Sequence, residues 1–387
     1  MSLSRLPLSY CTNVHPGRSV AQVMEGLDRY TVRVRDNLKH PLAAGLWLAR
    51  PVVSELLATP EGVRRFADDL ARRGLTCHTL NAFPFGDFHS TRVKEKVYLP
   101  DWTTAERLQY TLDCARVLAE LLPANADGSI STLPLAFKAL AANGLVDAAI
   151  ERLIECARGL DRLRNESGKL IRLAIEPEPL CVLETTDEAI TFFRQLWQRA
   201  GGSIEMVRTH LGLCYDICHQ AVEFEDVAAS IAALDTAGVR INKIHISCAL
   251  ELKRPAENLE GRMALRKYVE ERYLHQTIAR TREGRIVRET DLNQKFIENP
   301  GDEFLSADSW RIHFHVPVDA QQMGPLETTR EDLKKALAAV KKLSYAPHLE
   351  VETYTWEVLP DAGQADLAEG LTREMIATEQ VLKEVGE

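Results

Sequence analysis

The chain has 387 residues, of which 45% are hydrophobic and 27% charged, a composition typical of a globular protein with a large core. It excludes a disordered chain and a small disulfide-stabilised fold. With 47 Lys and Arg against 56 Asp and Glu, the net charge of −9 argues against a broad surface for nucleic acid or anionic membrane, and favours small-molecule or protein partners.

The cysteines and the N-terminus both indicate a cytoplasmic protein. The 8 cysteines are scattered without a CxxC pair, and several lie in apolar runs such as Leu213-Cys214-Tyr215, so we expect them to be reduced. The N-terminus lacks the apolar segment and cleavage site of a signal peptide. No apolar stretch approaches the roughly 18 residues of a membrane span.

Short apolar runs alternate along the chain with longer segments of helical period, which is the pattern of βα units in a parallel sheet. The predicted strands are residues 6–11, 45–49, 75–80, 130–133, 171–175, 211–215, 241–246, 312–316 and 349–351. The predicted helices are residues 19–37, 60–73, 104–122, 145–165, 186–200, 226–237 and 329–342. We therefore predict one α/β domain over residues 1–387, a (β/α)₈ TIM barrel of eight strands, with the ninth strand in an insertion.

The insertion is marked by a change of pattern after Leu250. A charged stretch at 251–272 gives way to two alternating segments around a turn at 281–284. We interpret residues 251–307 as a helix followed by a β-hairpin, inserted after the seventh strand. It would lie over the C-terminal mouth of the barrel, where barrel enzymes carry their chemistry. Its exposed strand edge could instead pair with a second subunit in a homodimer, or with another pathway protein.

Four successive barrel strands each end in a residue that can bind a metal. These residues are Glu176, Asp216, His245 and Glu352, and Glu350 is the alternative on the last strand because it has the same parity. The carboxyl ends of barrel strands meet at one rim, where three carboxylates would repel one another without a cation. Carboxylates with one imidazole suit Mn²⁺, Mg²⁺, Zn²⁺ or Fe²⁺, so the set predicts a divalent metal. The alternative is that each is an ordinary surface polar group.

A second polar group comes from histidines. Period-two alternation places His313 and His315 on one face, and His219 follows Asp216 by about one turn. The three imidazoles predict either a second metal site or a polar wall of the substrate pocket, and the sequence leaves both open.

Further residues after the strands are candidates for binding a polyol or sugar-like small molecule. They are His15, Asn81, Tyr354 and Trp356, together with His219 and His315. Aromatic faces suit the C–H surface of such a molecule, and amides and imidazoles suit its hydroxyls. The alternative for each aromatic residue is core packing.

At Glu176, Asp216, His219, His245 and Glu352 the chain resembles the xylose-isomerase-like TIM barrels, which include sugar isomerases, ketose epimerases and endonuclease-IV-type apurinic endonucleases. The run 216–219, Asp-Ile-Cys-His, is close to the Asp-Thr-Cys-His of the endonucleases. Within this superfamily, residues 8–17 and 348–356 are similar to the EboE-type metabolite-traffic proteins of bacterial secondary-metabolite clusters.

This resemblance implies roles for the predicted residues. Glu176 and Glu352 would bind the metal and exchange the substrate proton, Asp216 and His245 would complete the metal shell, and His219 would contact substrate or join a second metal. The chain departs from the endonucleases at 313–315, where they carry Asp-x-His, and it lacks their histidines on the second and third strands. A trinuclear site is therefore not expected.

The leading functional hypothesis is a metal-dependent isomerase or epimerase of a sugar, sugar phosphate or cyclitol in a secondary-metabolite pathway. One alternative is a metal-dependent phosphoester hydrolase. Another is a non-catalytic protein that binds a metabolite and passes it to partners. The charge of −9 disfavours a role in DNA repair.

Overall fold

Eight parallel strands close into a barrel in the computed structural model, which describes residues 3, 6–360 and 366–386. The order around the barrel is β1-β14-β7-β6-β5-β4-β3-β2. The strands are β1 (Ser9–Cys11), β2 (Ala43–Trp47), β3 (Thr79–Asn81), β4 (Gly128–Thr132), β5 (Ile171–Ile175), β6 (Leu211–Asp216), β7 (Ile241–Ile246) and β14 (His348–Val351). The predicted (β/α)₈ barrel is confirmed.

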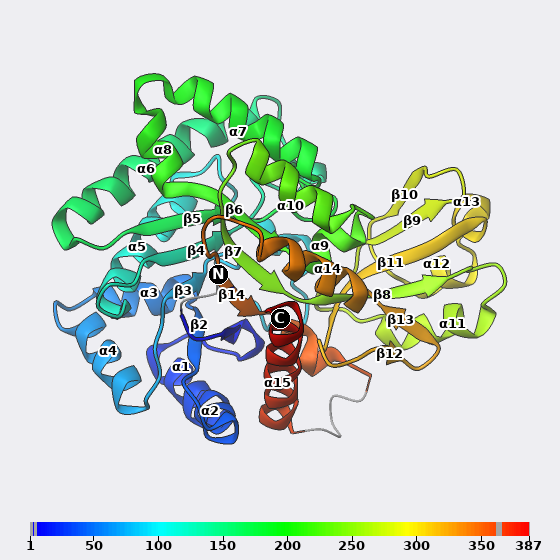
Figure 1. Ribbon diagram of the computed structural model, residues 1–387, viewed down its shortest axis with the longest axis horizontal. Coiled ribbons are helices and arrows are strands. Elements are labelled where there is room, and N and C mark those ends of the chain that lie inside the picture. Colours follow the sequence, from blue (N-terminus) through cyan, green and yellow to red (C-terminus); the bar gives the residue numbers. More distant parts are fainter. Residues whose placement is uncertain (1–2, 4–5, 361–365, 387) are drawn as a thin grey trace.

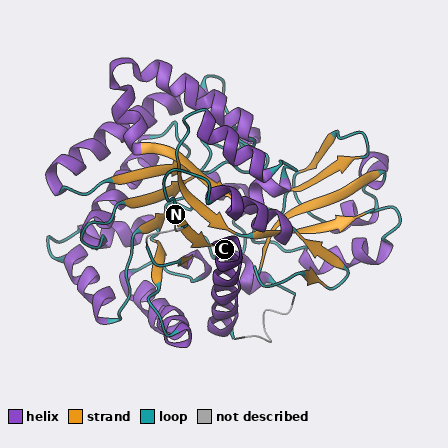
Figure 2. Cartoon of the chain, viewed as in Figure 1, coloured by secondary structure: helices purple, strands orange, loops and turns teal. Residues whose placement is uncertain are grey.

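Helices surround this barrel on the outside (Figure 2). They are α1 (Val20–Gly26), α2 (Val32–Leu38), α3 (Arg50–Leu57), α4 (Gly62–Arg72), α5 (Ala105–Leu121), α6 (Leu145–Ser167), α7 (Thr186–Ala200), α8 (Ile204–His210), α9 (Ile217–Val222), α10 (Val227–Thr236), α14 (Arg330–Val340) and α15 (Leu367–Gly386). The predicted helix at 19–37 is present as α1 and α2, joined by a π-helical turn at Leu27–Thr31. Helices α3, α8 and α9, which have only two turns each, were not predicted from the sequence, nor was the long α15.

A second sheet lies beside the barrel, to the right in Figure 1, with the strand order β10-β9-β11-β8-β13-β12. Its strands are β8 (Cys248–Lys253), β9 (Thr277–Thr281), β10 (Ile286–Glu289), β11 (Ala307–Val316), β12 (Gln322–Met323) and β13 (Leu326–Thr328). Three short helices accompany them: α11 (Leu259–Ala264), α12 (Gln294–Glu298) and α13 (Gly301–Leu305). We call residues 248–328 the inserted sheet.

The inserted sheet differs from the expected helix and hairpin at 251–307. The hairpin is present as β9 and β10, but the charged stretch at 251–272 begins inside β8 and contains only the short α11 and a 3-10 turn. The predicted strand at 312–316 is part of β11, which pairs antiparallel with β8. Charged Glu251 fits a strand because Arg311 of β11 lies beside it, with 3.3 Å between Nε and Oε1.

Strand β7 connects the barrel to the inserted sheet, since β8 begins only one residue after it. Alternate residues of a strand point to opposite sides. Lys243 and His245 share the side that faces the barrel interior, where the Lys243 ammonium reaches Ser131 of β4 at 3.2 Å. One strand therefore supplies a site residue and, directly beyond it, the start of the sheet that lies next to the site. Within the described residues, no helix combines the length and apolarity needed to cross a membrane.

Candidate metal centre

The structure brings the four predicted metal ligands together at the carboxyl ends of their strands. Glu176 directly follows β5, Asp216 ends β6, His245 lies near the end of β7, and Glu352 directly follows β14. Parallel pairing sets Asp216 beside His245. One donor atom from each of the four residues lies within 4.8 Å of the others, and all four side chains are buried. Register between adjacent strands therefore builds the cluster.

His245 is at the centre of this cluster. Its Nδ1 lies 2.7 Å from Glu176 Oε1, 3.2 Å from Glu352 Oε2 and 3.6 Å from Asp216 Oδ2. Its Nε2 lies 3.1 Å from Glu350 Oε1 on the other side of the ring. Glu350 is thus behind the histidine, and Glu352 is the carboxylate of the last strand that belongs to the four-residue cluster.

Lys243 neutralises Glu350 beneath the cluster. Its Nζ lies 2.6 Å from Glu350 Oε1, and both side chains are fully buried. Burial alone would raise the pKa of Glu350, but the Lys243 ammonium and the His245 imidazole outweigh it and lower this pKa to about 2. Neither sequence motif nor resemblance pointed to Lys243, although a lysine among the isoleucines of a buried strand is itself a signal.

Hydrogen bonds hold the outer carboxylates in place. Asn13 and Asn81 each donate to Glu352 Oε1 at 2.9 Å, and Ser247 donates to Asp216 Oδ1 at 2.7 Å. Burial raises the pKa of Glu352 to about 8 despite His245, and the nearby carboxylates of Glu176 and Asp216 add to the effect.

Two oxygens of the clustered carboxylates lack a hydrogen-bond donor. Glu176 Oε2 and Asp216 Oδ2 are buried and have no hydrogen-bond partner among the described residues. An unpaired buried carboxylate oxygen is costly, and a divalent cation would satisfy both oxygens. The donor set of three carboxylates and one imidazole therefore fits a divalent metal ion.

The three predicted histidines lie next to this cluster, and each has its Nδ1 on an oxygen acceptor. The Nδ1 of His219 lies 3.0 Å from the Pro177 carbonyl, that of His313 lies 2.8 Å from Gln276 Oε1, and that of His315 lies 2.8 Å from the Glu352 carbonyl. A carbonyl oxygen only accepts, so each Nδ1 carries the hydrogen and each Nε2 of a neutral ring has a free lone pair.

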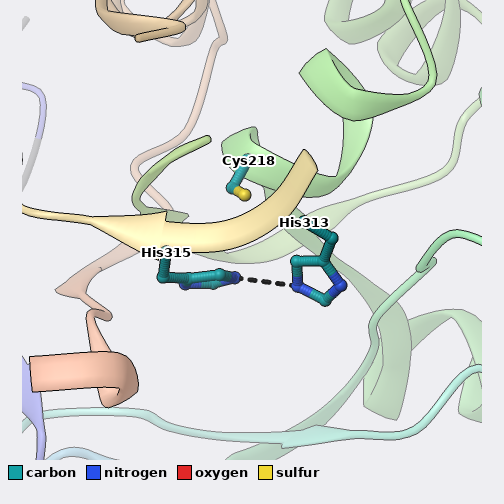
Figure 3. A group of neighbouring side chains, drawn as sticks. All are labelled: Cys218, His313 and His315. Atoms are coloured by element: carbon teal, nitrogen blue, oxygen red, sulfur yellow. Dashed lines mark hydrogen bonds between the residues drawn. The ribbon is translucent and has the colours of Figure 1, made fainter. Parts of the chain in front are cut away.

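The two Nε2 atoms of His313 and His315 face each other at 3.1 Å (Figure 3). Burial and the neighbouring imidazoles hold the pKa of His313 well below its usual range, and burial lowers the pKa of His315 to about 4. Both rings are therefore neutral, and two lone pairs point at one another. Asp216, His219 and His315 also have donor atoms within 4.8 Å of one another.

Glu178 is a further residue of the site, and it was not among the predicted ones. Its Oε1 accepts from Tyr98 at 2.6 Å and from Gln276 at 3.2 Å, and it groups with His219 and His313. Burial raises the pKa of Glu178 to about 7. The available signal was the repeated Glu-Pro at 176–179, which gives Glu178 the same parity as Glu176.

A cavity opens above the cluster. Glu176, Glu178, His219, His313 and Glu352 form its polar floor. Asn13, Asn81 and Tyr354 also line it, and His315 lies behind His313. Predicted metal ligands and predicted substrate-binding residues thus line the same cavity.

Three predicted pocket residues do not line this cavity: His15, His315 and Trp356. His15 instead accepts or donates at Tyr10 OH, 2.9 Å away, and its ring stacks on Tyr30. Trp356 donates its indole N–H to Glu374 of α15 at 2.7 Å. For His15 and Trp356 the chain turns after the strand end and directs the side chain into packing between helices, which strand parity does not foresee.

The inserted sheet contributes part of the cavity wall. Tyr273, Leu274 and His313 come from it. Lys94, in the 3-10 turn Lys94–Tyr98, connects the barrel to it by donating to the carbonyls of Glu270 and Tyr273 at 3.0 and 2.7 Å. The mouth of the barrel is therefore shared between barrel loops and the inserted sheet.

No protein-family model and no curated protein sequence matches the chain. Solved structures match it over nearly its whole length. A xylose isomerase-like TIM barrel protein from Mycobacterium smegmatis in complex with magnesium is 13% identical, with a TM-score of 0.54, and the match covers 100% of this chain and 99% of that one. The chain has the xylose isomerase-like TIM-barrel fold. The IOLI protein with a bound zinc atom is 12% identical, with a TM-score of 0.50, and the match covers 98% of this chain and 99% of that one.

Proposed function

We propose that the protein is a metal-dependent isomerase or epimerase that acts on a sugar-like polyol. The observation that carries this proposal is the pair of buried carboxylates, Glu176 and Glu352, which flank His245 at the floor of a cavity. Magnesium and zinc in two proteins of the same fold support the metal. A place in a secondary-metabolite pathway, as in the EboE-type proteins that the sequence resembles, is part of the same proposal.

Glu176, Asp216, His245 and Glu352 would hold the ion, as Mn²⁺, Mg²⁺, Zn²⁺ or Fe²⁺. When bound, it would stabilise negative charge on adjacent oxygens of the substrate. Glu176 and Glu352 come from strands that are separated by β6 and β7, so a substrate carbon between them meets two carboxylates from two sides. One carboxylate takes a proton from this carbon and the other returns it.

Other side chains position Glu352 or can contact the substrate. Asn13 and Asn81 fix the Oε1 atom of Glu352, which directs Oε2 towards His245. Glu178 and His219 line the same floor, where they can bind substrate hydroxyls.

The test is exchange of the hydrogen beside a carbonyl for deuterium in D₂O, measured by mass spectrometry with metal-loaded protein and a panel of ketoses. We expect exchange with the wild type and loss of at least about 100-fold in Glu176→Gln and Glu352→Gln. Glu120→Gln, on the exposed face of α5, is the matched control. Exchange that persists in both site variants would refute the assigned roles.

The facing Nε2 atoms of His313 and His315 support a second proposal, namely that a second cation binds at His219, His313 and His315. Two lone pairs at 3.1 Å repel unless a cation lies between or beside them. A second ion would suit the alternative function of phosphoester hydrolysis.

In His313→Ala/His315→Ala we expect the metal content to fall from two ions to one. His275→Gln, a buried histidine of the same sheet, is the control. Unchanged metal content would leave these imidazoles as substrate contacts.

We also propose that the inserted sheet covers the active-site mouth. Tyr273 and Leu274 supply its part of the wall, and the link through Lys94 holds it against the barrel. Its edge strand β10 offers an alternative role in pairing with a second subunit. Arg288→Pro in β10 would block such pairing, so a dimer that becomes a monomer in size-exclusion chromatography would favour the interface role.

A further inference from the structure

The cavity above the metal centre is lined by two unlike sets of side chains. Its floor carries the carboxylates and imidazoles described above. Its outer wall is carbon, from the segment after β3, the following 3-10 turn and the inserted sheet: Phe83, Pro84, Phe88, Val93, Val97 and Leu274. Of these side chains only Val97 is not fully buried. Such a wall makes no hydrogen bond to a ligand, so it can only bind an apolar surface.

Three polar residues beside this wall, Tyr98, Lys94 and Tyr273, already have partners within the protein. The Tyr273 hydroxyl donates to the Phe88 carbonyl at 3.2 Å, and the Tyr98 hydroxyl donates to Glu178. Lys94 donates to the carbonyls of Glu270 and Tyr273 and to Asp291 Oδ2 at 2.7 Å. Its three N–H groups therefore all have acceptors.

Charge at the site is unfavourable for a phosphate group. Lys94 is the single lysine or arginine among the described residues that line the cavity, and it is fully engaged. Lys243, beneath the floor, is fully buried and paired with Glu350. The floor itself carries Glu176, Glu178 and Glu352, and a phosphoryl dianion would meet these acidic side chains without a free lysine or arginine to bind it.

We infer that the substrate of this site is an unphosphorylated molecule with two parts. One part carries adjacent carbonyl and hydroxyl oxygens, which reach the carboxylate floor. The other part is an apolar substituent, an aromatic ring or a branched hydrocarbon, which packs on the outer wall. The oxygen-bearing part rests on the proposed function. The apolar part rests on the wall, and the exclusion of phosphate rests on the engaged lysines and on the acidic side chains of the floor.

The inference is tested with three α-hydroxyketones that present the same pair of oxygens. Hydroxyacetone has no further group, dihydroxyacetone phosphate adds a phosphate, and 2-hydroxyacetophenone adds a phenyl ring. Binding to the Mg²⁺-loaded full-length protein is measured by isothermal titration calorimetry. Burial of a phenyl ring predicts a Kd for 2-hydroxyacetophenone about 10-fold to 100-fold below that of hydroxyacetone. Dihydroxyacetone phosphate is expected to bind no more tightly than hydroxyacetone. Tighter binding of the phosphate compound, or no gain from the ring, would overturn the inference.

A matched pair of valines shows whether the ring binds at the wall. Val97 lines the cavity, whereas Val182 lines a different surface hollow, and both are half-buried. Val97→Ser should raise the Kd of 2-hydroxyacetophenone several-fold and leave that of hydroxyacetone unchanged. Val182→Ser should change neither. If Val97→Ser leaves both constants unchanged in a folded protein, the ring binds elsewhere and the inference fails.

The outcomes separate this inference from the proposed function. Deuterium exchange beside the carbonyl of each bound ketone reports on the isomerase, and the order of the three Kd values reports on the substrate class. A preference for 2-hydroxyacetophenone without exchange upholds the inference and refutes the isomerase. Exchange with dihydroxyacetone phosphate, bound more tightly than the aromatic ketone, upholds the isomerase and refutes the inference.

Discussion

His245 and Glu350 are hydrogen-bonded inside the barrel, with 3.1 Å between Nε2 and Oε1. Since the carboxylate is ionised beside Lys243, it accepts the Nε2 hydrogen and leaves the lone pair of a neutral ring on Nδ1. Nδ1 is the atom that faces Glu176, Asp216 and Glu352. A carboxylate that orients a ligating histidine in this way is a common support of metal sites.

Glu350 and Glu352 should therefore differ in their effect on metal binding. Glu350→Gln removes the support of His245, and we expect metal affinity to fall by about 10-fold to 100-fold with the saturating metal content unchanged. Glu352→Gln removes a ligand and should lower the metal content itself. Titration with Mn²⁺, together with elemental analysis, measures both quantities. Equal effects of the two substitutions would contradict the arrangement.

Loss of Lys243 should destabilise the fold strongly. Lys243→Met leaves the buried Glu350 without its cation, and such an uncompensated charge costs about 3–5 kcal/mol of unfolding free energy. The double variant Lys243→Met/Glu350→Gln removes the charge as well and should recover part of the loss. Urea unfolding of the single and double variants measures this coupling. If the double variant is as unstable as the sum of the singles, the pair is not coupled.

Gly45 of β2 is required by the position of Glu350. A Cβ atom at residue 45 would lie 1.4 Å from Glu350 Oε2, and the partners of Glu350 prevent it from moving freely. Gly45→Ala is expected to cost about 1–3 kcal/mol and to weaken metal binding. Gly202→Ala is the control because no atom lies within 4 Å of a Cβ there, so its stability should stay within about 0.5 kcal/mol of wild type. Thermal unfolding compares the two.

Acid should weaken the ion pair between Arg272 of the inserted sheet and Glu357, which follows β14. The His89 imidazole and the Arg272 guanidinium lower the pKa of Glu357 to about 2. A lowered pKa stabilises the fold above the unfolded value of about 4.3, and this contribution is lost as the pH falls towards 2. Wild type should thus be more stable than Glu357→Gln at neutral pH, and the difference should disappear near pH 2. Glu260→Gln, exposed on α11, is the control. A difference that does not change with pH would exclude a charge effect.

The barrel and its four-residue cluster could be predicted from the sequence because both depend on local pattern. Buried parallel strands appear as apolar runs, and β5 and β7 have the predicted bounds. The carboxyl ends of such strands meet at one rim whatever the loops do, so the convergence of Asp216 and His245 follows from strand order.

Contacts between distant segments decided the inserted sheet and the partners of the individual site residues. Residues 248–328 form a six-stranded sheet because β8 pairs with β11, about 60 residues later along the chain, and no local pattern specifies that pairing. Glu350 and Glu352 have the same parity in the sequence, and only the contact of Glu350 with Lys243 on the neighbouring strand β7 assigns one to support and the other to the cluster. His15 and Trp356 follow strands as predicted, but the chain bends there and their partners on other segments set their direction. The sequence by itself determined which residues reach the rim, because the two-residue alternation of side chains along a strand depends on that strand alone. The tertiary structure decided what each residue faces, since that depends on atoms hundreds of positions away.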